Sequence, residues 1–427
     1  MTQEDAASIS GSVLWWAYAP DTTVGEKWIA AFNEVYPNIQ VTYKNFENTD
    51  YPPALTSAFQ AGSGPDVFNI APGGSIAGRE LWADYAMDLS AQAEAWLGSD
   101  WKNKYATGYV DQLTWKGSVV SLPLGGVASD FVWVNKNLFD AQGIDPLSLK
   151  TYDDLKAACD KFSAAGIQCW TMGANGMDGF AAETWRTICD SVEPGYYAAA
   201  LKGERQWDEA PAIEAMQILR QMQTDGIISA DATSIKQYPE ANNNFMAQKA
   251  AIVQMGTWYA QYAVAESQIE SAEGAGVSNP EPFVMIPIPA PDFAGKGNVP
   301  PYVGEADYGL AIAADSKNKA AASVFVMWLT STEAGQLAVD NAIDLVPSFG
   351  VDPDWENLGL VDPDYQIPIF QEMFQTAAQA TESRNEKQTP ATATAQVVAV
   401  QQLLSDPNMS IEDIVAQMQA DSEPYTG

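Results

Sequence analysis

The stretch DYPPALTSAFQAGSGPDVFNI, residues 50–70, predicts a helix, a tight turn and a buried strand. Asp50 precedes apolar residues at helical spacing and is a possible N-cap, while Gly62 suits the end of the helix and a proline blocks its continuation. Phosphate-binding loops run in the opposite order, into a helix, and this loop also has no lysine. We interpret the stretch as a turn that places Asp66 and Asn69 along a buried strand.

The segments before this stretch alternate in the same way. Residues 11–17, GSVLWWA, are an apolar strand, residues 24–35 carry apolar side chains at helical spacing, and residues 39–43, IQVTY, alternate as a half-buried strand does. Strand, helix, strand, helix and strand in this order predict a parallel α/β sheet with right-handed crossovers. Similar alternation continues along the chain, and the C-terminal part is expected to be mainly helical.

The length and the charge of the chain restrict its architecture and its partners. A chain of 427 residues exceeds the size at which one hydrophobic core keeps growing, so we expect two domains. The formal net charge is −34, from 55 acidic and 21 basic residues. A field of that sign excludes nucleic acid and anionic membranes as main partners and disfavours anionic ligands.

Histidine is absent, which excludes Ser-His-Asp and Cys-His catalysis and histidine-dependent zinc sites. The three cysteines, Cys159, Cys169 and Cys189, have no metal-binding spacing. A Cys159–Cys169 disulfide and buried free thiols are both compatible with the sequence. The aspartate-rich residues 352–364 lack the glycine and terminal glutamate of an EF-hand loop, so we predict no metal site and no cofactor.

The N-terminal residues give little indication of location. Residues 1–12, MTQEDAASISGS, contain no signal peptide and are expected to form a polar mature N-terminus or a tether. No apolar stretch approaches the ~20 residues that cross a bilayer.

The residues that follow the predicted strands have a common chemistry. Ligands of open α/β sheets bind beyond the carboxyl ends of the strands. Aromatic rings stack on the C–H faces of sugars, and carboxylate and amide oxygens pair with sugar hydroxyls. A sugar ligand is therefore predicted, with these residues as candidate contacts: Trp16, Tyr18, Glu47, Asn69 and Trp258.

Several blocks together carry a family resemblance. WIAAFNEVYPNIQVTY (28–43), the stretch at 50–70, SLPLGGVASDFVWVNKNLFDAQGID (121–145), TYDDLKAACDKF (151–162), FMAQKAAIVQMGTWYAQ (245–261) and AIAADSKNKAAASVFVMWLTSTEAGQ (311–336) occur in one order. The chain resembles the extracellular solute-binding proteins of carbohydrate ATP-binding-cassette importers, family 1, the group that is similar to maltose-binding protein. The resemblance runs nearly end to end.

The resemblance implies a two-lobed α/β fold of the periplasmic-binding-protein type II, with a hinge of crossing strands. The N-terminal lobe is expected at 1–124 and 285–332. The C-terminal lobe is expected at 125–284 and 333–427, with a helical C-terminal extension. A neutral oligosaccharide is expected in the cleft between the lobes, which close on it.

The resemblance also implies the partners and the location. We expect a non-enzymatic monomer that delivers the sugar to transmembrane permease subunits of an ATP-binding-cassette importer. Its expected place is the extracellular face of the membrane, with a lipid anchor, or the periplasm.

Further candidate residues follow from the resemblance. In the second lobe, MDGFAAETW provides Phe180 and Trp185 where relatives carry an aromatic residue after Asp-Gly. KQTPATATAQVVAV (387–400) lacks the aromatic residue that maltose-binding protein carries there, which argues against maltodextrin. The remaining candidate contacts are polar: Asp66, Asp130, Glu305 and Asp307.

Two other functions remain as alternatives. A secreted carbohydrate-active hydrolase would use a carboxylate pair, but nothing in the sequence places two carboxylates across a scissile bond. A glycan-binding surface protein without a permease would need no hinge. Turnover of an oligosaccharide mixture distinguishes the first alternative, and domain closure on ligand distinguishes the second.

Overall fold

The computed structural model describes residues 2–74, 76–177, 179–380 and 382–426, which form two compact units. Unit 1 comprises residues 1–127 and 304–358, and unit 2 comprises residues 128–303 and 359–427. The first boundary lies within three residues of the one that the resemblance implied. The other two lie further along the chain than 284 and 332.

Unit 1 is built on a five-stranded sheet in the order β2-β1-β3-β13-β6. The first three strands are parallel, as the strand–helix alternation predicts, whereas β13 runs antiparallel to both of its neighbours, β3 and β6. The strands are β1 (Gly11–Ala17), β2 (Ile39–Asn45), β3 (Val67–Ile70), β4 (Thr114–Trp115), β5 (Ser118–Val119), β6 (Leu122–Pro123) and β13 (Gly309–Ile312). The helices are α1 (Gln3–Ala6), α2 (Thr22–Val35), α3 (Tyr51–Gln60), α4 (Arg79–Trp82), α5 (Ser90–Leu97), α6 (Tyr109–Gln112), α14 (Lys319–Ser331) and α15 (Glu333–Asp340).

The stretch at 50–70 folds into the predicted helix, turn and strand, although the Asp50 side chain makes no capping hydrogen bond to α3. Helix α3 ends at Gln60, and Gly62 follows with a φ of +67°, which glycine adopts without strain. Strand β3 is fully buried and pairs with β1 and β13. The turn therefore leads the chain into β3, the central strand of the sheet.

Aromatic side chains fill one face of this sheet. Trp15 on β1 is fully buried and stacks against Trp28 of α2 at 6.3 Å, and Phe325 of α14 lies 5.5 Å from it. Helix α15 packs on α2 and α14. This packing assigns residues 333–340 to unit 1, rather than to the second lobe that the resemblance implied.

Unit 2 has a four-stranded sheet in the order β11-β8-β10-β9. Only β9 and β10 are parallel, because β8 runs antiparallel to both β10 and β11. β11 pairs with β8 along its whole length, which places residues 285–288 in unit 2. The strands are β8 (Phe131–Asn135), β9 (Gln168–Thr171), β10 (Ala250–Met255) and β11 (Met285–Ile288); β7 (Gly126–Ser129) and β12 (Val303–Ala306) run across the first two unit boundaries.

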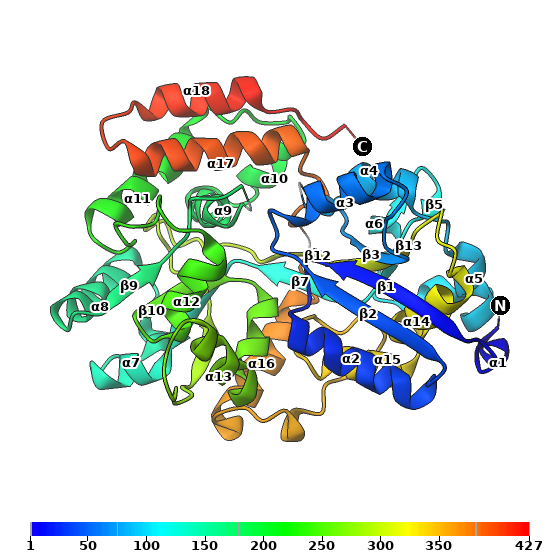
Figure 1. Ribbon diagram of the computed structural model, residues 1–427. Coiled ribbons are helices and arrows are strands. Elements are labelled where there is room, and N and C mark those ends of the chain that lie inside the picture. Colours follow the sequence, from blue (N-terminus) through cyan, green and yellow to red (C-terminus); the bar gives the residue numbers. More distant parts are fainter. Residues whose placement is uncertain (1, 75, 178, 381, 427) are drawn as a thin grey trace. The chain divides into compact units, whose positions relative to one another are not determined.

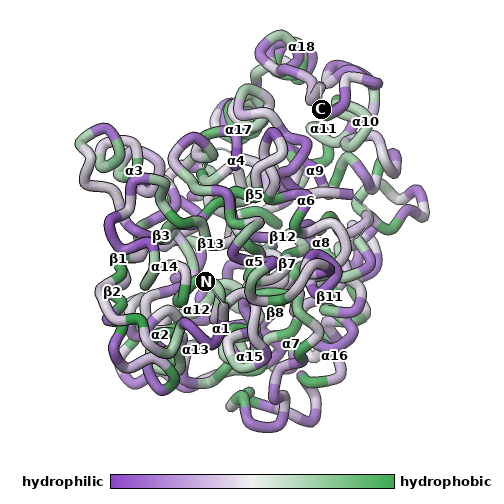
Figure 2. The backbone as a smooth tube through the Cα atoms, turned by 90° about the vertical axis from the view of Figure 1, so that its right-hand side faces the viewer, coloured by the Kyte–Doolittle hydropathy of each residue, from purple (hydrophilic) through white to green (hydrophobic). Residues whose placement is uncertain are grey.

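Helices surround the sheet of unit 2, and the C-terminal part is helical as expected. In Figure 1, α17 and α18 lie side by side as the orange and red helices; α17 packs on α9 and α11, and α18 packs on α11. Figure 2 colours the chain by hydropathy, and strands β8 and β13 are buried along their whole length. The helices are α7 (Lys136–Ala141), α8 (Tyr152–Ala164), α9 (Phe180–Val192), α10 (Tyr196–Leu201), α11 (Ala210–Thr224), α12 (Asn242–Met246), α13 (Ala265–Gly274), α16 (Pro363–Ala377), α17 (Pro390–Ser405) and α18 (Ile411–Asp421).

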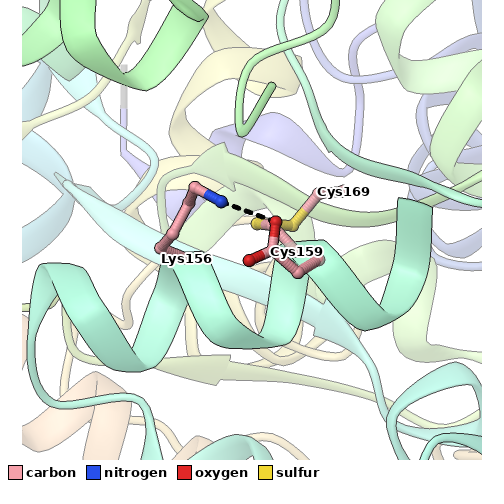
Figure 3. The surroundings of a disulfide bond; sticks show 4 residues. Lys156, Cys159 and Cys169 are labelled. Carbon is pink, nitrogen blue, oxygen red and sulfur yellow. Dashed lines mark hydrogen bonds and ion pairs between the residues drawn. A yellow bond between two sulfur atoms is a disulfide. The ribbon is translucent and has the colours of Figure 1, made fainter. Parts of the chain in front are cut away.

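The structure decides between the two states of the cysteines. Cys159 of α8 and Cys169 of β9 form a disulfide, with their Cα atoms 5.0 Å apart, and Cys189 is a buried free thiol. Figure 3 shows this bond beside Lys156, whose Nζ atom donates to Asp160 at 2.6 Å. The disulfide ties a helix to the strand that follows it.

Within the described ranges, no helix is long and apolar enough to cross a membrane.

Helix α15 ends at a buried carboxyl group. Asp340 is fully buried, and among the described residues neither of its oxygens has a hydrogen-bond partner. Burial, together with the charge of Asp352, raises the pKa of Asp340 to about 8. The folded chain therefore keeps a proton that the unfolded chain releases near pH 4, so Asp340 lowers stability progressively as the pH rises from about 4 to about 8.

We predict that Asp340→Asn removes this loss. The variant should match the wild type near pH 4 and exceed its free energy of unfolding by on the order of 2–4 kcal/mol near pH 8. Urea unfolding across this pH range measures the difference, with the exposed Asp160→Asn as the control. A variant that is less stable than the wild type by the same amount at both ends of the range would contradict the assignment.

Candidate functional site

Three half-buried aromatic rings of unit 2 lie together. Phe180 is the first residue of α9, Tyr238 precedes α12, and Trp258 lies in a 3₁₀ turn (Thr257–Ala263) directly after β10. The ring centroid of Phe180 is 5.7 Å from that of Tyr238 and 6.1 Å from that of Trp258. The indole Nε1 of Trp258 donates to the Tyr238 hydroxyl at 3.3 Å. We call these three rings the aromatic cluster.

Gly256 permits the position of the indole. A Cβ atom at this residue would overlap the Cε3 and Cζ3 atoms of Trp258 and would lie 2.5 Å from the carbonyl oxygen of Ala128. The φ of Gly256 is −96°, so the glycine is required by space rather than by backbone conformation. The six-membered part of the indole therefore rests directly on the main chain at the end of β10.

A cation lies over the aromatic cluster. The guanidinium carbon of Arg384, from the segment between α16 and α17, is 4.6 Å from the ring centroid of Trp258 and 6.0 Å from that of Phe180. Two nitrogens of Arg384 contact one carboxylate oxygen of Glu183, Nε at 2.7 Å and Nη2 at 2.5 Å. Both side chains of this pair are largely buried.

The ion pair continues into the interior of unit 2. Arg186 lies 3.8 Å from Glu183 and forms a bidentate pair with Asp130, at 2.7 and 3.3 Å. Burial alone would lower the pKa of Arg186, but the charges of Asp130 and Glu183 outweigh it and raise the pKa. Burial and the charge of Asp130 raise the pKa of the neighbouring Asp190 to about 7.

The candidates of unit 2 divide into two groups. Phe180 and Trp258 lie in the aromatic cluster. Trp185 does not: its indole is fully buried and packs against Trp207 and Tyr197, so it is a core residue and the prediction of a ligand contact is corrected. Asp130 is also buried, and its carboxylate is occupied by Arg186, which gives it a structural role.

The aromatic candidates of unit 1 lie on one face of β1. Trp16 and Tyr18 are half-buried, whereas their neighbours Trp15 and Ala17 point into the core. Trp16 lies 5.0 Å from Phe46, and Lys44 lies over both rings. The Tyr18 ring lies edge-on to Tyr51 and to Tyr308, at 5.4 and 5.7 Å.

Two polar candidates of unit 1 are used by the fold itself. The Asp66 carboxylate accepts hydrogen bonds from the Leu14 amide, the Ser316 hydroxyl and the Asn318 amide nitrogen. Asn69 is fully buried; its Oδ1 accepts from Trp15 and its Nδ2 donates to the carbonyl of Ala19. Asn69 is a core residue, so its predicted ligand contact is corrected, whereas contact of the half-buried Asp66 with a ligand stays a prediction.

The remaining candidates are acidic residues of unit 1. Glu47 is exposed in the loop after β2, Glu305 is buried and Asp307 is half-buried. Burial, together with the charges of Asp307 and Glu305, raises the pKa of Tyr109 to about 12, which indicates that both carboxylates lie near its hydroxyl. Their contact with a ligand stays a prediction.

Sequence reasoning missed Tyr238, Arg384 and Glu183. Tyr238 follows no strand, and Arg384 stands just before the segment where an aromatic residue was sought. The one indication in the sequence was that Arg384 is among only 21 basic residues of the chain. Within the described part of the chain, no group of three or more acidic or cysteine side chains is arranged to hold a metal ion.

The chain is similar to proteins of one family. Residues 18–336 match the family described as bacterial extracellular solute-binding proteins. An uncharacterized ABC transporter extracellular-binding protein of Pyrococcus horikoshii is 26% identical over 162 residues, 37% of this chain and 36% of that protein. The xylose/arabinose-binding protein XacG of Haloferax volcanii is 23% identical over 242 residues, 54% of this chain and 49% of that protein. The matches thus span half or less of these relatives.

A solved structure agrees in fold. It is described for xylan utilization by the thermophilic bacterium Caldanaerobius polysaccharolyticus, superposes with a TM-score of 0.73 at 21% identity, and covers 96% of this chain and 99% of its own. The likeness confirms the two-lobed mixed α/β fold, and the family match spans most of the sequence. The chain belongs to the bacterial extracellular solute-binding proteins.

Proposed function

We propose that the chain binds a neutral oligosaccharide and delivers it to the membrane permease of an ATP-binding-cassette importer. The aromatic cluster of unit 2 is the observation that carries this proposal. A half-buried indole beside two further rings offers the apolar surface on which the C–H face of a pyranose stacks. Solute binding is the activity for which the family is named.

The charge of the chain supports a neutral ligand. With 55 acidic and 21 basic residues, the protein repels carboxylated, sulfated and phosphorylated sugars. Arg384, which contacts the aromatic cluster, is engaged by Glu183, and the neighbouring Arg186 is engaged by Asp130. An anionic ligand would compete with these carboxylates for the arginines.

Unit 1 supports the proposal with a second group of rings. Trp16 is the penultimate residue of β1, and Tyr18 and Phe46 directly follow β1 and β2, at the edge of the sheet where ligands of parallel sheets bind. We propose that Glu47 and Asp307 accept hydroxyl hydrogen bonds there, that the protein acts as a monomer, and that the crossing strands form a hinge that closes on the sugar. The proposed location is the outer face of the membrane, with a lipid anchor, or the periplasm.

The names of two similar proteins suggest which sugars to test first. XacG is called a xylose/arabinose-binding protein, and the solved structure is described for xylan utilization. We therefore begin a screen with xylo- and arabino-oligosaccharides and extend it to neutral hexose and N-acetylhexosamine oligomers. A ligand at 100 times its Kd should add about 2.7 kcal/mol to the free energy of unfolding.

We predict that Trp258→Ala weakens binding of the best sugar more than tenfold, because a buried anchor typically contributes ~2 kcal/mol or more. Titration calorimetry measures the affinity, and the melting of the sugar-free variant should stay close to that of the wild type. The core tryptophan gives the opposite result: Trp185→Ala should cost ~3–5 kcal/mol of stability. Retained affinity with a large loss of stability in Trp258→Ala would assign Trp258 to the core.

We predict that Gly256→Ala also weakens binding about tenfold or more, because the added methyl group displaces the indole. The matched control is Gly274→Ala at the end of α13, where a Cβ atom meets nothing within 4 Å. Calorimetry on both variants tests the geometry. Equal affinities of the two variants would mean that the position of the indole does not matter for binding.

A further inference from the structure

We infer that Arg384 is a positioning residue for the sugar platform: its guanidinium lies over the Trp258 indole and holds the ring in the position in which it serves as a stacking surface. This inference rests on the proposed function, since it assigns a role within the same site. It adds a residue outside every sequence block that carries the resemblance. Arg384 belongs to the segment between α16 and α17, far along the chain from the 3₁₀ turn that carries Trp258.

The geometry gives Arg384 a fixed place on the ring. A guanidinium 4.6 Å from the indole centroid lies in the range of cation–π attraction. Phe180 lies 6.0 Å from the same cation, so Arg384 contacts two of the three rings of the aromatic cluster.

The ion pair with Glu183 fixes the guanidinium in turn. Nε and Nη2 both contact Glu183 Oε1, and each side chain of the pair exposes only 13% or 12% of its surface. A pair buried to this extent resists displacement, because removing one partner leaves the other charge uncompensated. Arg384 should therefore stay in contact with the Trp258 ring when the sugar binds, and the sugar should not displace it.

Glu183 is itself held by the interior of unit 2. It lies on the first turns of α9 beside Arg186, which binds Asp130 and also donates to the Ser129 hydroxyl at 2.6 Å. Asp130 has a φ of +78°, a conformation that a non-glycine residue adopts only when its surroundings hold it there. Arg384 is thus connected through Glu183 and Arg186 to the buried interior of unit 2.

The consequence for binding is preorganisation. Ordering a free side chain on association costs about 0.5–1.5 kcal/mol, and a ring held in advance avoids this cost. Loss of the support should therefore weaken sugar binding by about three- to tenfold, less than loss of the ring itself.

The test uses Arg384→Met, which keeps the length of the side chain and removes its charge. The full chain is labelled with 5-fluorotryptophan, and the ¹⁹F resonance of Trp258, one of 14 tryptophans, is assigned by its loss in Trp258→Phe. In the sugar-free protein, we expect Arg384→Met to shift and broaden this resonance. Arg384→Lys should do the same, because an ammonium lacks the planar fork that both stacks and pairs with Glu183.

A matched control is present in the same unit. Arg205 lies 5.0 Å from the ring centroid of Tyr196 and pairs with Glu193 and Glu209, so it repeats the chemistry of Arg384 away from the aromatic cluster. Arg205→Met should leave both the Trp258 resonance and the sugar affinity unchanged. Affinity is measured by calorimetry with the oligosaccharide that gives the largest melting shift, starting from xylotriose.

Two results would overturn the inference. One is a Trp258 resonance that is the same in Arg384→Met and in the wild type. The other is an unchanged or higher affinity in Arg384→Met, which would make Arg384 neutral or a competitor of the sugar. If the wild type binds no sugar of the panel, the proposed function fails, whereas the resonance of the sugar-free protein still decides whether Arg384 positions the ring.

Discussion

The contact between the Trp258 indole and the bare main chain at Gly256 is the constraint on which the rest of the site depends. Because no Cβ atom intervenes, the ring lies close against the end of β10. The Tyr238 hydroxyl, the Phe180 ring and the Arg384 guanidinium also contact this indole. Each of these contacts requires the indole to be where Gly256 allows it, so a single methyl group at that residue would disturb all of them.

Two arginines of unit 2 are buried in ion pairs, although the chain as a whole is strongly acidic. A chain with an excess of 34 negative charges would be expected to keep its few cations at the surface, where they are well solvated. Arg186 is instead buried between Asp130 and Glu183, and Arg384 is largely buried beside Glu183. A buried pair of this kind adds little net stability but strongly disfavours other arrangements of its partners. Here it orders the residues beneath an aromatic surface that is otherwise held by weak contacts.

The fold was largely predictable from the sequence, and the site only in part. The helical spacing of apolar residues, Gly62 and the short run after Pro65 identified the helix, turn and strand at 50–70, because these signals are local: Gly62 follows the end of the helix and β3 is buried throughout. The antiparallel direction of β13 and the packing of α15 on α2 could not be predicted, because they depend on contacts between residues far apart in the chain. Position after a strand identified Trp258 but not the state of its neighbours. Asn69 was chosen by the same rule, but it lies inside β3, and its side chain, like that of Asp66 just before β3, bonds to β1; Arg384 belongs to no strand.

The central claim is that a neutral sugar stacks on the Trp258 ring, and saturation-transfer difference NMR tests it most directly. Aromatic protons of the protein are irradiated in the presence of an excess of the oligosaccharide that binds best. The account predicts strong transfer to the C–H protons on one face of a single sugar ring, with much weaker transfer to the opposite face, and loss of this pattern in Trp258→Ala. Transfer that is uniform over the sugar, or a pattern that persists without the indole, would contradict it.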